Sequence, residues 1–216
     1  MSVEEHRNSP VSIGIDLGGT KALGVAIDST GAILGEARLQ MPAGSAQISA
    51  GVGAKGPGED VIGCVVDIVA TLRGDHGPSP AETDGFAVGV GAPGMVDRHG
   101  VIRFSPHLPG AAGADLKHLL SAYLPGVIPY IDNDANCAAL GECRLGALVG
   151  VKVALVVTLG TGIGGGVVVD GEVVRGAEGF AGEIGHMVVD SSGPPCPCGR
   201  HGCWERTAYE GQRNSC

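Results

Sequence analysis

The 216-residue sequence is poor in aromatic residues, in basic residues and in long apolar runs. Aromatic side chains make up 3% of the chain, so a core has to be built mainly from Val, Leu, Ile and Ala. Because 14 Lys and Arg stand against 23 Asp and Glu, and no basic run occurs, nucleic acid and anionic membranes are poor candidates for partners. No segment approaches the roughly 18 uninterrupted apolar residues of a membrane helix, and the N-terminus lacks the apolar region of a signal peptide. We therefore expect a cytoplasmic protein.

Hydrophobic residues and glycine are abundant in this chain. Hydrophobic residues make up 44% of it, enough for a real core, and the 39 glycines predict tight turns and loops lined by backbone. Thiols stay reduced in the cytosol, so the seven cysteines are not interpreted as a disulfide framework.

Strand and helix patterns alternate along the chain, which predicts an α/β fold with a mixed sheet. Residues 1–10 are expected to be disordered, residues 11–40 to form an antiparallel meander with a turn at 28–31, and residues 41–58 to form a loop. Further expected elements are a helix over 59–73, a strand over 85–94, a helix from 115, a strand over 127–134 and a helix over 134–148. The segments VALVVTL, GIGGGVVVDGEVVRG and GEIGHMVVD predict a β hairpin with a second turn at Asp170 and Gly171.

The segment GIDLGGTK, residues 14–21, places an aspartate at the end of a strand and two glycines and a threonine in the turn that follows. Such a turn exposes backbone N–H groups to a phosphate. Asp16 is placed to hold a water of a magnesium ion and Thr20 to bond a phosphate oxygen, while Gly18, Gly19 and Lys21 complete the turn. The Walker spacing is absent. The alternative is an ordinary hairpin turn with a charged rim.

The segment TLGTGIGGG, residues 158–166, matches the dinucleotide pattern GxGxxG, but β-branched residues and an Asp-Gly turn follow it. That fingerprint has to open a helix, so we do not interpret the match as a dinucleotide site. A glycine-rich turn between two strands instead allows close approach of a polyphosphate, and the candidate residues are Gly160, Thr161, Gly162 and Gly164. With the first turn, it suggests two hairpins that grip one nucleotide. The alternative is a hairpin that binds no ligand.

The segment IDNDAN, residues 131–136, ends a strand and begins a helix. Asp134 lies at this junction, where a carboxylate faces a cleft and remains ionised beside the helix N-terminus. As a base it would accept a proton from a substrate hydroxyl. The alternative is that Asp132 or Asp134 caps the helix.

Four candidate metal ligands follow one another late in the sequence: His186, Cys196, Cys198 and Cys203, with nine, one and four residues between them. Such ligands fit a closed tetrahedral zinc site, and the prolines and glycines among them supply the bends of a chelating loop. We predict structural zinc. His201 in place of His186, or core or redox cysteines, are the alternatives. Small buried or incidental residues are the expected role of the isolated cysteines Cys64, Cys137, Cys143 and Cys216.

In this order, the four motifs resemble the ROK family of sugar kinases and repressors, within the actin-like/hexokinase ATPase superfamily. DLGGTK is similar to the first phosphate motif of the family, LGTGIGGG to its second, NDAN to the segment with its catalytic aspartate, and GEIGH with CPCGRHGCWE to its sugar-and-zinc signature. The resemblance covers roughly residues 12–206. It implies an actin-like ATPase (ribonuclease H-like) fold of two lobes with mixed β-sheets. We expect the first lobe over 11–130, an incomplete second lobe with the zinc loop over 131–206, and an atypical tail over 207–216.

The resemblance also implies an activity, the transfer of the ATP γ-phosphoryl group to a hexose, with the 6-hydroxyl of glucose as the expected acceptor. Asp134 would be the catalytic residue, and Mg²⁺ would bridge the phosphates. Zinc would order the sugar pocket without joining the chemistry. His186 would bind zinc through one ring nitrogen and sugar through the other. The other implied sugar-binding residues are Asn133, Asp134, Glu183 and Glu205. A homo-oligomer is also expected.

Two features depart from the family pattern. The segment FSPHLPG carries His107 where the family commonly has a sugar-binding Asn, and an imidazole can also donate and accept hydrogen bonds. After CWER, the chain reads TAYEGQRNSC, where the family continues with the segments that hold adenosine. We expect a truncated or frameshifted ending that uncovers apolar faces, with weak or absent catalysis and poor solubility.

Two other functions are alternatives to the kinase. One is a non-catalytic remnant that binds zinc and sugar. The other is a ROK transcriptional repressor without its DNA-binding domain, which is disfavoured by the acidic charge and by the roughly ten residues before the first strand.

Overall fold

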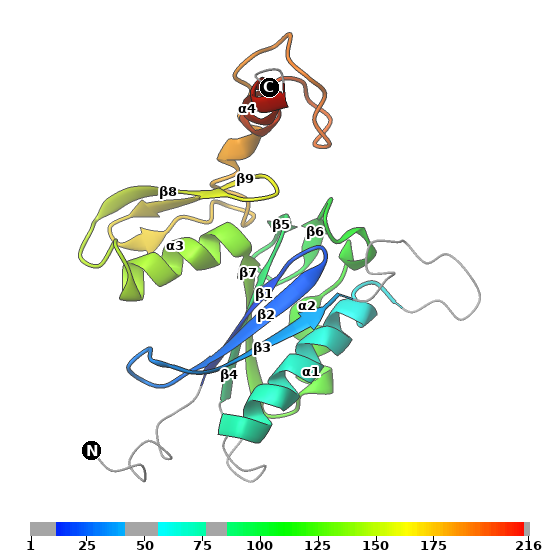
Figure 1. Ribbon diagram of the computed structural model, residues 1–216, viewed down its shortest axis with the longest axis vertical. Helices are drawn as coiled ribbons and strands as arrows, with labels where there is room; N and C mark the ends of the chain where they lie inside the picture. Colours follow the sequence, from blue (N-terminus) through cyan, green and yellow to red (C-terminus); the bar gives the residue numbers. More distant parts are fainter. Residues whose placement is uncertain (1–11, 42–55, 77–85, 214–216) are drawn as a thin grey trace. The chain divides into compact units, whose positions relative to one another are not determined.

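The structure, a computed structural model, describes residues 12–41, 56–76 and 86–213 (Figure 1). The chain divides into two compact units, Met1–Asp134 and Ala135–Cys216, which are taken separately below. The expected disorder of residues 1–10 and most of the loop over 41–58 lie outside the described residues. Among the helices described, none combines the length and the apolar character needed to cross a membrane.

A five-stranded mixed sheet forms the centre of the first unit, in the order β3-β2-β1-β4-β7. Strands β1, β2 and β3 form the predicted antiparallel meander, while β4 and β7 run parallel to β1. Buried and less buried residues alternate along β1 and β2, as a strand with one face on a core requires. The strands are β1 Ser12–Leu17, β2 Lys21–Ile27, β3 Ile33–Gln40, β4 Phe86–Ala92 and β7 Val127–Asn133.

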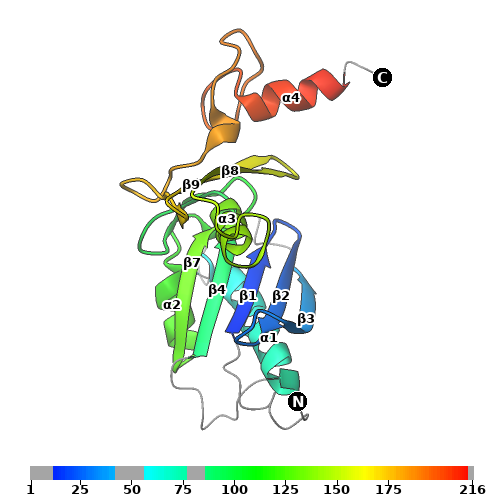
Figure 2. The same ribbon diagram turned by 90° about the vertical axis from the view of Figure 1, so that its left-hand side faces the viewer.

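Helices α1 (Glu59–His76) and α2 (Leu116–Tyr123) pack against this sheet, α1 over β2 and β3 and α2 over β7 (Figure 2). Asp115 caps α2, since its side chain accepts a hydrogen bond from the His118 N–H at 2.8 Å. The apolar stripe predicted for α1 is buried, and with the strands it forms a continuous core. Its fully buried members include Ile13, Leu17, Val61, Ile62, Val65, Ile68, Leu72, Ile102, Leu108, Leu116 and Leu120.

A short hairpin that the sequence analysis did not predict follows β4. It consists of β5 (Met95–Val96) and β6 (Ile102–Phe104), and the 3₁₀ helix η3 (Pro109–Ala111) comes after it. Asp97 organises the turn of this hairpin, because its Oδ1 accepts hydrogen bonds from the N–H groups of His99 and Val101 at 2.8 and 3.0 Å. This hairpin and η3 place His107 close to the first glycine-rich turn.

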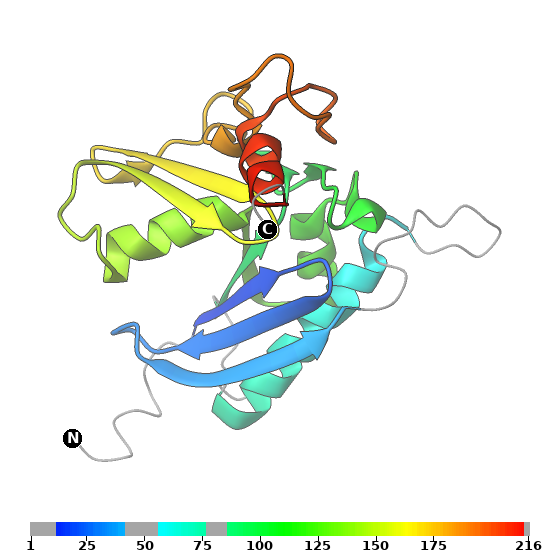
Figure 3. The same cartoon turned by 45° about the horizontal axis from the view of Figure 1, so that its top comes forward.

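The second unit contains an antiparallel sheet in the order β10-β9-β8, with helix α3 packed against it (Figure 3). Helix α3 spans Asp134–Leu145, and the strands are β8 Val153–Leu159, β9 Ile163–Val169 and β10 Glu172–Val173. Asp170 and Gly171, with φ of 55° and 80°, make the predicted turn between β9 and β10. Gly166 lets α3 approach β9, because a Cβ there would lie 2.5 Å from the Cβ of Ala139. Within the described residues this sheet is antiparallel throughout, not mixed.

The segment GEIGHMVVD is not a strand, contrary to the hairpin prediction. It contains the 3₁₀ helix η4 (Ile184–His186), followed by irregular backbone. Gly182 has φ of 93°, and Gly185 lies so close to the Ile163 carbonyl oxygen that a Cβ would collide with it. Helix α4 (Trp204–Arg213) follows the cysteine loop, so the predicted boundary at 206 falls inside a helix.

Candidate active site and metal centre

The parallel strands β1, β4 and β7 end at one edge of the sheet, where the first group of candidate residues lies. In register, Asp16 pairs with Gly91 and Gly91 pairs with Asp132. Paired residues point to the same face, and Gly91 contributes no side chain, so the two carboxylates belong to one face of the sheet with no side chain between them in this register. Carboxyl ends of parallel strands are the usual place for ligands in α/β sheets.

The turn between β1 and β2 requires both of its glycines. The Gly18 N–H donates to the Lys21 carbonyl oxygen at 2.8 Å, and a Cβ on Gly18 would lie 2.9 Å from that oxygen. A Cβ on Gly19 would lie 3.0 Å from the carbonyl oxygen of His107. This turn therefore packs against the loop that carries the predicted sugar residue. Thr20 is exposed at its tip.

The carboxylate of Asp16 lies just before this turn. Partial desolvation raises the pKa of Asp16 above its ordinary value, and the positive charge of Lys21 acts against that rise. A carboxylate in this situation is stabilised further by an added cation, as expected of a residue that holds a metal-bound water.

Asn133 and His107 are placed by hydrogen bonds of the neighbouring loops. The buried Asn133 donates from Nδ2 to the carbonyl oxygen of Gly94 at 3.0 Å, which fixes the end of β7 to the turn after β4. Gly94 has φ of 99° and packs against Ser105. Ser105 Oγ accepts from the Leu108 N–H at 3.1 Å and shapes the loop in which the side chain of His107 is exposed.

Asp134 is the first residue of α3, half-buried in the first turn of the helix. The partial positive charge of a helix N-terminus favours the ionised form of a carboxylate at this place. The neighbouring Asp132, in β7, accepts the Asn133 N–H through Oδ1 at 2.8 Å, a local contact with the next residue. The catalytic role of Asp134 stays a prediction.

The second glycine-rich turn connects β8 and β9. The Gly160 N–H donates to the carbonyl oxygen of Gly162 at 3.0 Å, and Thr161 is exposed at the tip. Gly164 has a packing role, because a Cβ there would lie 3.0 Å from the Cβ of Ala135 on α3. Packing against α3 is sufficient to explain the glycine at 164, and phosphate binding by this turn stays a prediction.

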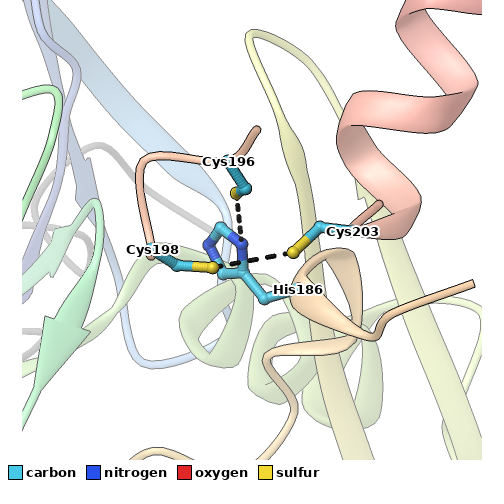
Figure 4. Close-up of side chains that lie close together, drawn as sticks. All are labelled: His186, Cys196, Cys198 and Cys203. Carbon is cyan, nitrogen blue, oxygen red and sulfur yellow. Dashed lines mark hydrogen bonds between the residues drawn. The ribbon is translucent and has the colours of Figure 1, made fainter. Parts of the chain in front are cut away.

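The four predicted metal ligands come together in the second unit (Figure 4). Their ligand atoms, one each from His186, Cys196, Cys198 and Cys203, all lie within 4.8 Å of one another. Cys196 Sγ is 3.4 Å from His186 Nδ1, and the Sγ atoms of Cys198 and Cys203 are 3.6 Å apart. His201, the alternative to His186, is exposed and does not belong to this group.

This donor set fits zinc. Sulfur ligands at about 2.3 Å from a tetrahedral ion lie roughly 3.8 Å from one another, and the 3.6 Å between the Sγ atoms of Cys198 and Cys203 is close to this value. Three thiolates and one imidazole match the closed Cys₃His set of structural zinc sites. His186 presents Nδ1 to the group, which leaves Nε2 for the sugar contact predicted from the family resemblance.

The cysteine thiols differ in acidity before any metal binds. Desolvation raises the pKa of Cys198, but hydrogen bonds from the backbone and side chain of Arg200 and from the other two thiols outweigh it and lower the pKa to about 7. Burial of Cys203, together with its hydrogen bonds to Cys198 and Cys196, raises its pKa to about 12. Of these two thiols, Cys198 is the more readily deprotonated for a metal ion.

Glu183 and Glu205, the remaining predicted sugar residues, flank the metal ligands. Glu183 is half-buried and directly precedes η4. Glu205 accepts the Ile163 N–H through Oε2 at 2.9 Å, a contact with the second glycine-rich turn that the sequence analysis missed. It also missed Tyr209, whose hydroxyl bonds the carbonyl oxygen of Gly160 at 2.8 Å. The four-residue spacing puts Glu205 and Tyr209 on one face of α4, but both partners are backbone groups, so the sequence carries no signal for these contacts.

Comparison with known proteins finds the same family over most of the chain. The model of the ROK family matches residues 12–211. A glucokinase from Thermotoga maritima is 36% identical over 198 residues, which cover 91% of this chain and 56% of the relative. A putative xylose repressor from a Caldicellulosiruptor species is 34% identical over 209 residues, which cover 96% of this chain and 49% of the relative.

Solved structures agree with this comparison. A ROK family glucokinase from Streptomyces griseus, solved in complex with glucose and AMPPNP, is 34% identical with a TM-score of 0.70, over 90% of this chain and 56% of that chain. The predicted α/β fold of the actin-like ATPase type is thereby confirmed. The chain spans about half the length of the curated relatives it matches. With most of its own length matched by the family model, the chain belongs to the ROK family.

Proposed function

We propose that this chain carries the acceptor and phosphate sites of an ATP-dependent hexose kinase, with glucose as the expected substrate and the 6-hydroxyl as acceptor. One observation carries the proposal. The turn after β1, the His107 loop and the segment with Asn133 and Asp134 belong to one sheet edge of the first unit, where parallel strands end. The similarity to glucokinases supports the choice of sugar.

In the proposed reaction, Asp134 accepts the proton of the acceptor hydroxyl as the oxygen attacks the γ-phosphorus. Its position at the start of α3 keeps it ionised, and positioning contributes more to this step than a raised pKa. Asn133 and His107 orient the sugar, and the backbone N–H groups of the glycine-rich turns bind phosphate oxygens. Asp16 would hold the Mg²⁺ that binds with ATP, and this ion would supply positive charge to the phosphates.

In this proposal, zinc would order the side chains of the sugar pocket and take no part in phosphoryl transfer. His186 and the three cysteines would hold the ion, which would order the imidazole ring with Nε2 left for a sugar hydroxyl, and would order Glu183 and Glu205 on either side of the ligand set. Chemistry at phosphorus involves none of these groups.

The test is glucose-dependent ADP production by the purified chain with Mg²⁺, ATP and zinc. We expect Asp134→Asn to lower kcat by about 10²–10⁴-fold, the range for loss of a general base. Asp115→Asn is the matched control, because Asn caps a helix as well as Asp does. Equal rates for the wild type and Asp134→Asn would overturn the assignment of Asp134.

A sugar-binding protein without turnover is the second candidate function. It is favoured by the xylose repressors, which match this chain over a similar share of its length at 31–34% identity. Calorimetric titration with glucose separates the two functions. Binding that depends on Glu183 and His186, without ADP release from a zinc-loaded sample, would support the second candidate and exclude the first.

A further inference from the structure

Helix α4 holds the second glycine-rich turn with two side chains on one face. The Tyr209 hydroxyl donates to the carbonyl oxygen of Gly160 at 2.8 Å, with that of Gly162 as a weaker second acceptor at 3.4 Å. Glu205 Oε2 accepts the Ile163 N–H at 2.9 Å. Residues four apart on a helix face the same side, so α4 presents a donor and an acceptor together to the backbone of this turn.

The contact between α4 and the turn is close-packed as well as hydrogen-bonded. A Cβ added to Gly162 would collide with the carboxylate of Glu205. Glycine at this position therefore lets the carboxylate lie directly on the turn. The glycine pattern that predicts phosphate approach on one side of the turn also permits the approach of α4.

The same turn is connected to the metal centre by short paths through the backbone. Cys203 immediately precedes α4, and the Trp204 N–H donates to the carbonyl oxygen of Met187 at 2.8 Å, next to the ligand His186. On the other side of His186, Gly185 packs against the carbonyl oxygen of Ile163. Cys203 thus adjoins α4 and His186 adjoins Gly185, and both α4 and Gly185 contact the turn.

We propose that Tyr209 and Glu205 are positioning residues for the turn over 160–163, and that a metal ion at the Cys₃His group sets their position. Metal binding would fix the first turn of α4, and the two side chains would then hold the turn in the conformation that receives phosphate. Only this last step rests on the proposed function. The coupling between the metal centre and the turn does not depend on catalysis.

Amide hydrogen exchange measured on the full chain, with zinc added or removed by a chelator, tests the coupling. In the wild type, we expect zinc to slow exchange of the Ile163 amide about tenfold, because its hydrogen bond to a charged acceptor becomes persistent. In Tyr209→Phe, zinc should bind with unchanged stoichiometry, but the slowing should be much smaller. Tyr123→Phe, at an exposed tyrosine of α2, is the matched control and should behave as the wild type.

Two results would overturn the coupling: exchange in the wild-type turn that is the same with and without zinc, or full zinc-dependent protection in Tyr209→Phe. The wild-type comparison decides the question even if the variant folds poorly.

ADP production in the same samples separates this inference from the proposed function. Zinc-dependent protection without ADP production would exclude the kinase proposal and leave the coupling in place. ADP production with amide exchange in the turn that does not depend on zinc would exclude the coupling and leave the kinase proposal in place. Where turnover is measured, Tyr209→Phe should raise the KM for ATP about three- to tenfold and leave the KM for sugar unchanged.

Discussion

Both carboxylate oxygens of Asp97 accept hydrogen bonds. Its Oδ2 accepts the Arg103 Nε at 2.7 Å and pairs with Nη2 at 2.6 Å, while Oδ1 accepts two backbone N–H groups. Desolvation opposes ionisation, but the bonds from Val101, Arg103 and His99 together with the charge of Arg103 outweigh it, so the pKa of Asp97 lies below its ordinary value. Asp97 therefore stabilises the β5–β6 hairpin, and through it the His107 loop.

We expect Asp97→Asn to lower the free energy of unfolding by about 1–3 kcal/mol at neutral pH, since the amide keeps the backbone acceptor but loses the ion pair. A depressed folded-state pKa gives stability that is present above the unfolded value of about 3.9 and is lost as pH falls through the lower folded value. The difference between wild type and variant should thus shrink below about pH 4. Denaturant unfolding of the wild type and the variant at neutral pH and below about pH 4 measures this difference in the free energy of unfolding.

Glu36→Gln is the control for this prediction. Glu36 pairs with Arg38 at 3.2 Å, but both side chains are largely exposed, and such pairs contribute little. Equal stability of Asp97→Asn and the wild type at neutral pH would contradict the account of the hairpin.

At the scale of single residues, sequence motifs predicted that the four candidate metal ligands lie together but did not predict the hydrogen bonds that position the candidate site residues. The ligand set of His186 and three cysteines could be read from spacing, because a chelating loop is local. Tyr209 could not, since its acceptor on Gly160 lies 49 residues away and is a backbone carbonyl that no residue type marks. The same holds for Asn133, whose partner is the carbonyl oxygen of Gly94.

At the scale of elements, sequence periodicity predicted those helices and strands in which the tertiary contacts favour the same conformation as the local sequence. α1, β4, β7 and the β8–β9–β10 hairpin all lie close to their predicted positions. The exception is η4, where β-branched residues after GEIGH suggested a strand. Two glycines allow this segment to lie against the backbone of β9, so tertiary contacts override the local preference.

Gly185 is the element-scale test of this explanation. In Gly185→Ala, the added methyl group would collide with the carbonyl oxygen of Ile163, so η4 and His186 have to shift away from β9. We expect zinc affinity to fall about tenfold or more, the usual effect of disturbing groups that orient a ligand. Competition with a chromophoric zinc chelator measures the affinity.

Gly141→Ala on α3 is the matched control, since no atom lies within 4 Å of the added methyl group. It should leave zinc affinity unchanged and add up to about 1 kcal/mol of stability from helix propensity. Wild-type zinc affinity in Gly185→Ala would show that η4 is not held by its contact with β9.

At the scale of the whole molecule, the two units differ in how they are stabilised. The first has a large buried core formed by α1, α2 and the sheet. The described core of the second consists of Ala139, Val168 and Val173 with partly buried neighbours. A small core needs other constraints, and the hydrogen bonds of α4 to the turn over 160–163 supply some of them here. Composition alone could not predict this difference, because apolar residues occur in both units.

One face of β8 exposes a row of apolar side chains. Val153, Leu155, Val157 and Leu159 alternate with less exposed residues, and Leu155 and Leu159 have relative accessibilities of 57% and 75%. Within the described residues β8 pairs with β9 alone, which leaves its other edge open. An open edge beside an apolar row favours association with another strand.

We therefore expect the purified chain to self-associate as its concentration rises, and Leu155→Lys to shift it toward the monomer, because a lysine on an open strand opposes edge pairing. Light scattering after size exclusion at several concentrations measures the mass. Tyr123→Lys is the control, since Tyr123 is exposed to a similar degree but stands on α2 and not on a strand edge. If the wild type remains monomeric throughout, or if both variants have the same effect, the apolar row of β8 is not the surface through which this chain associates.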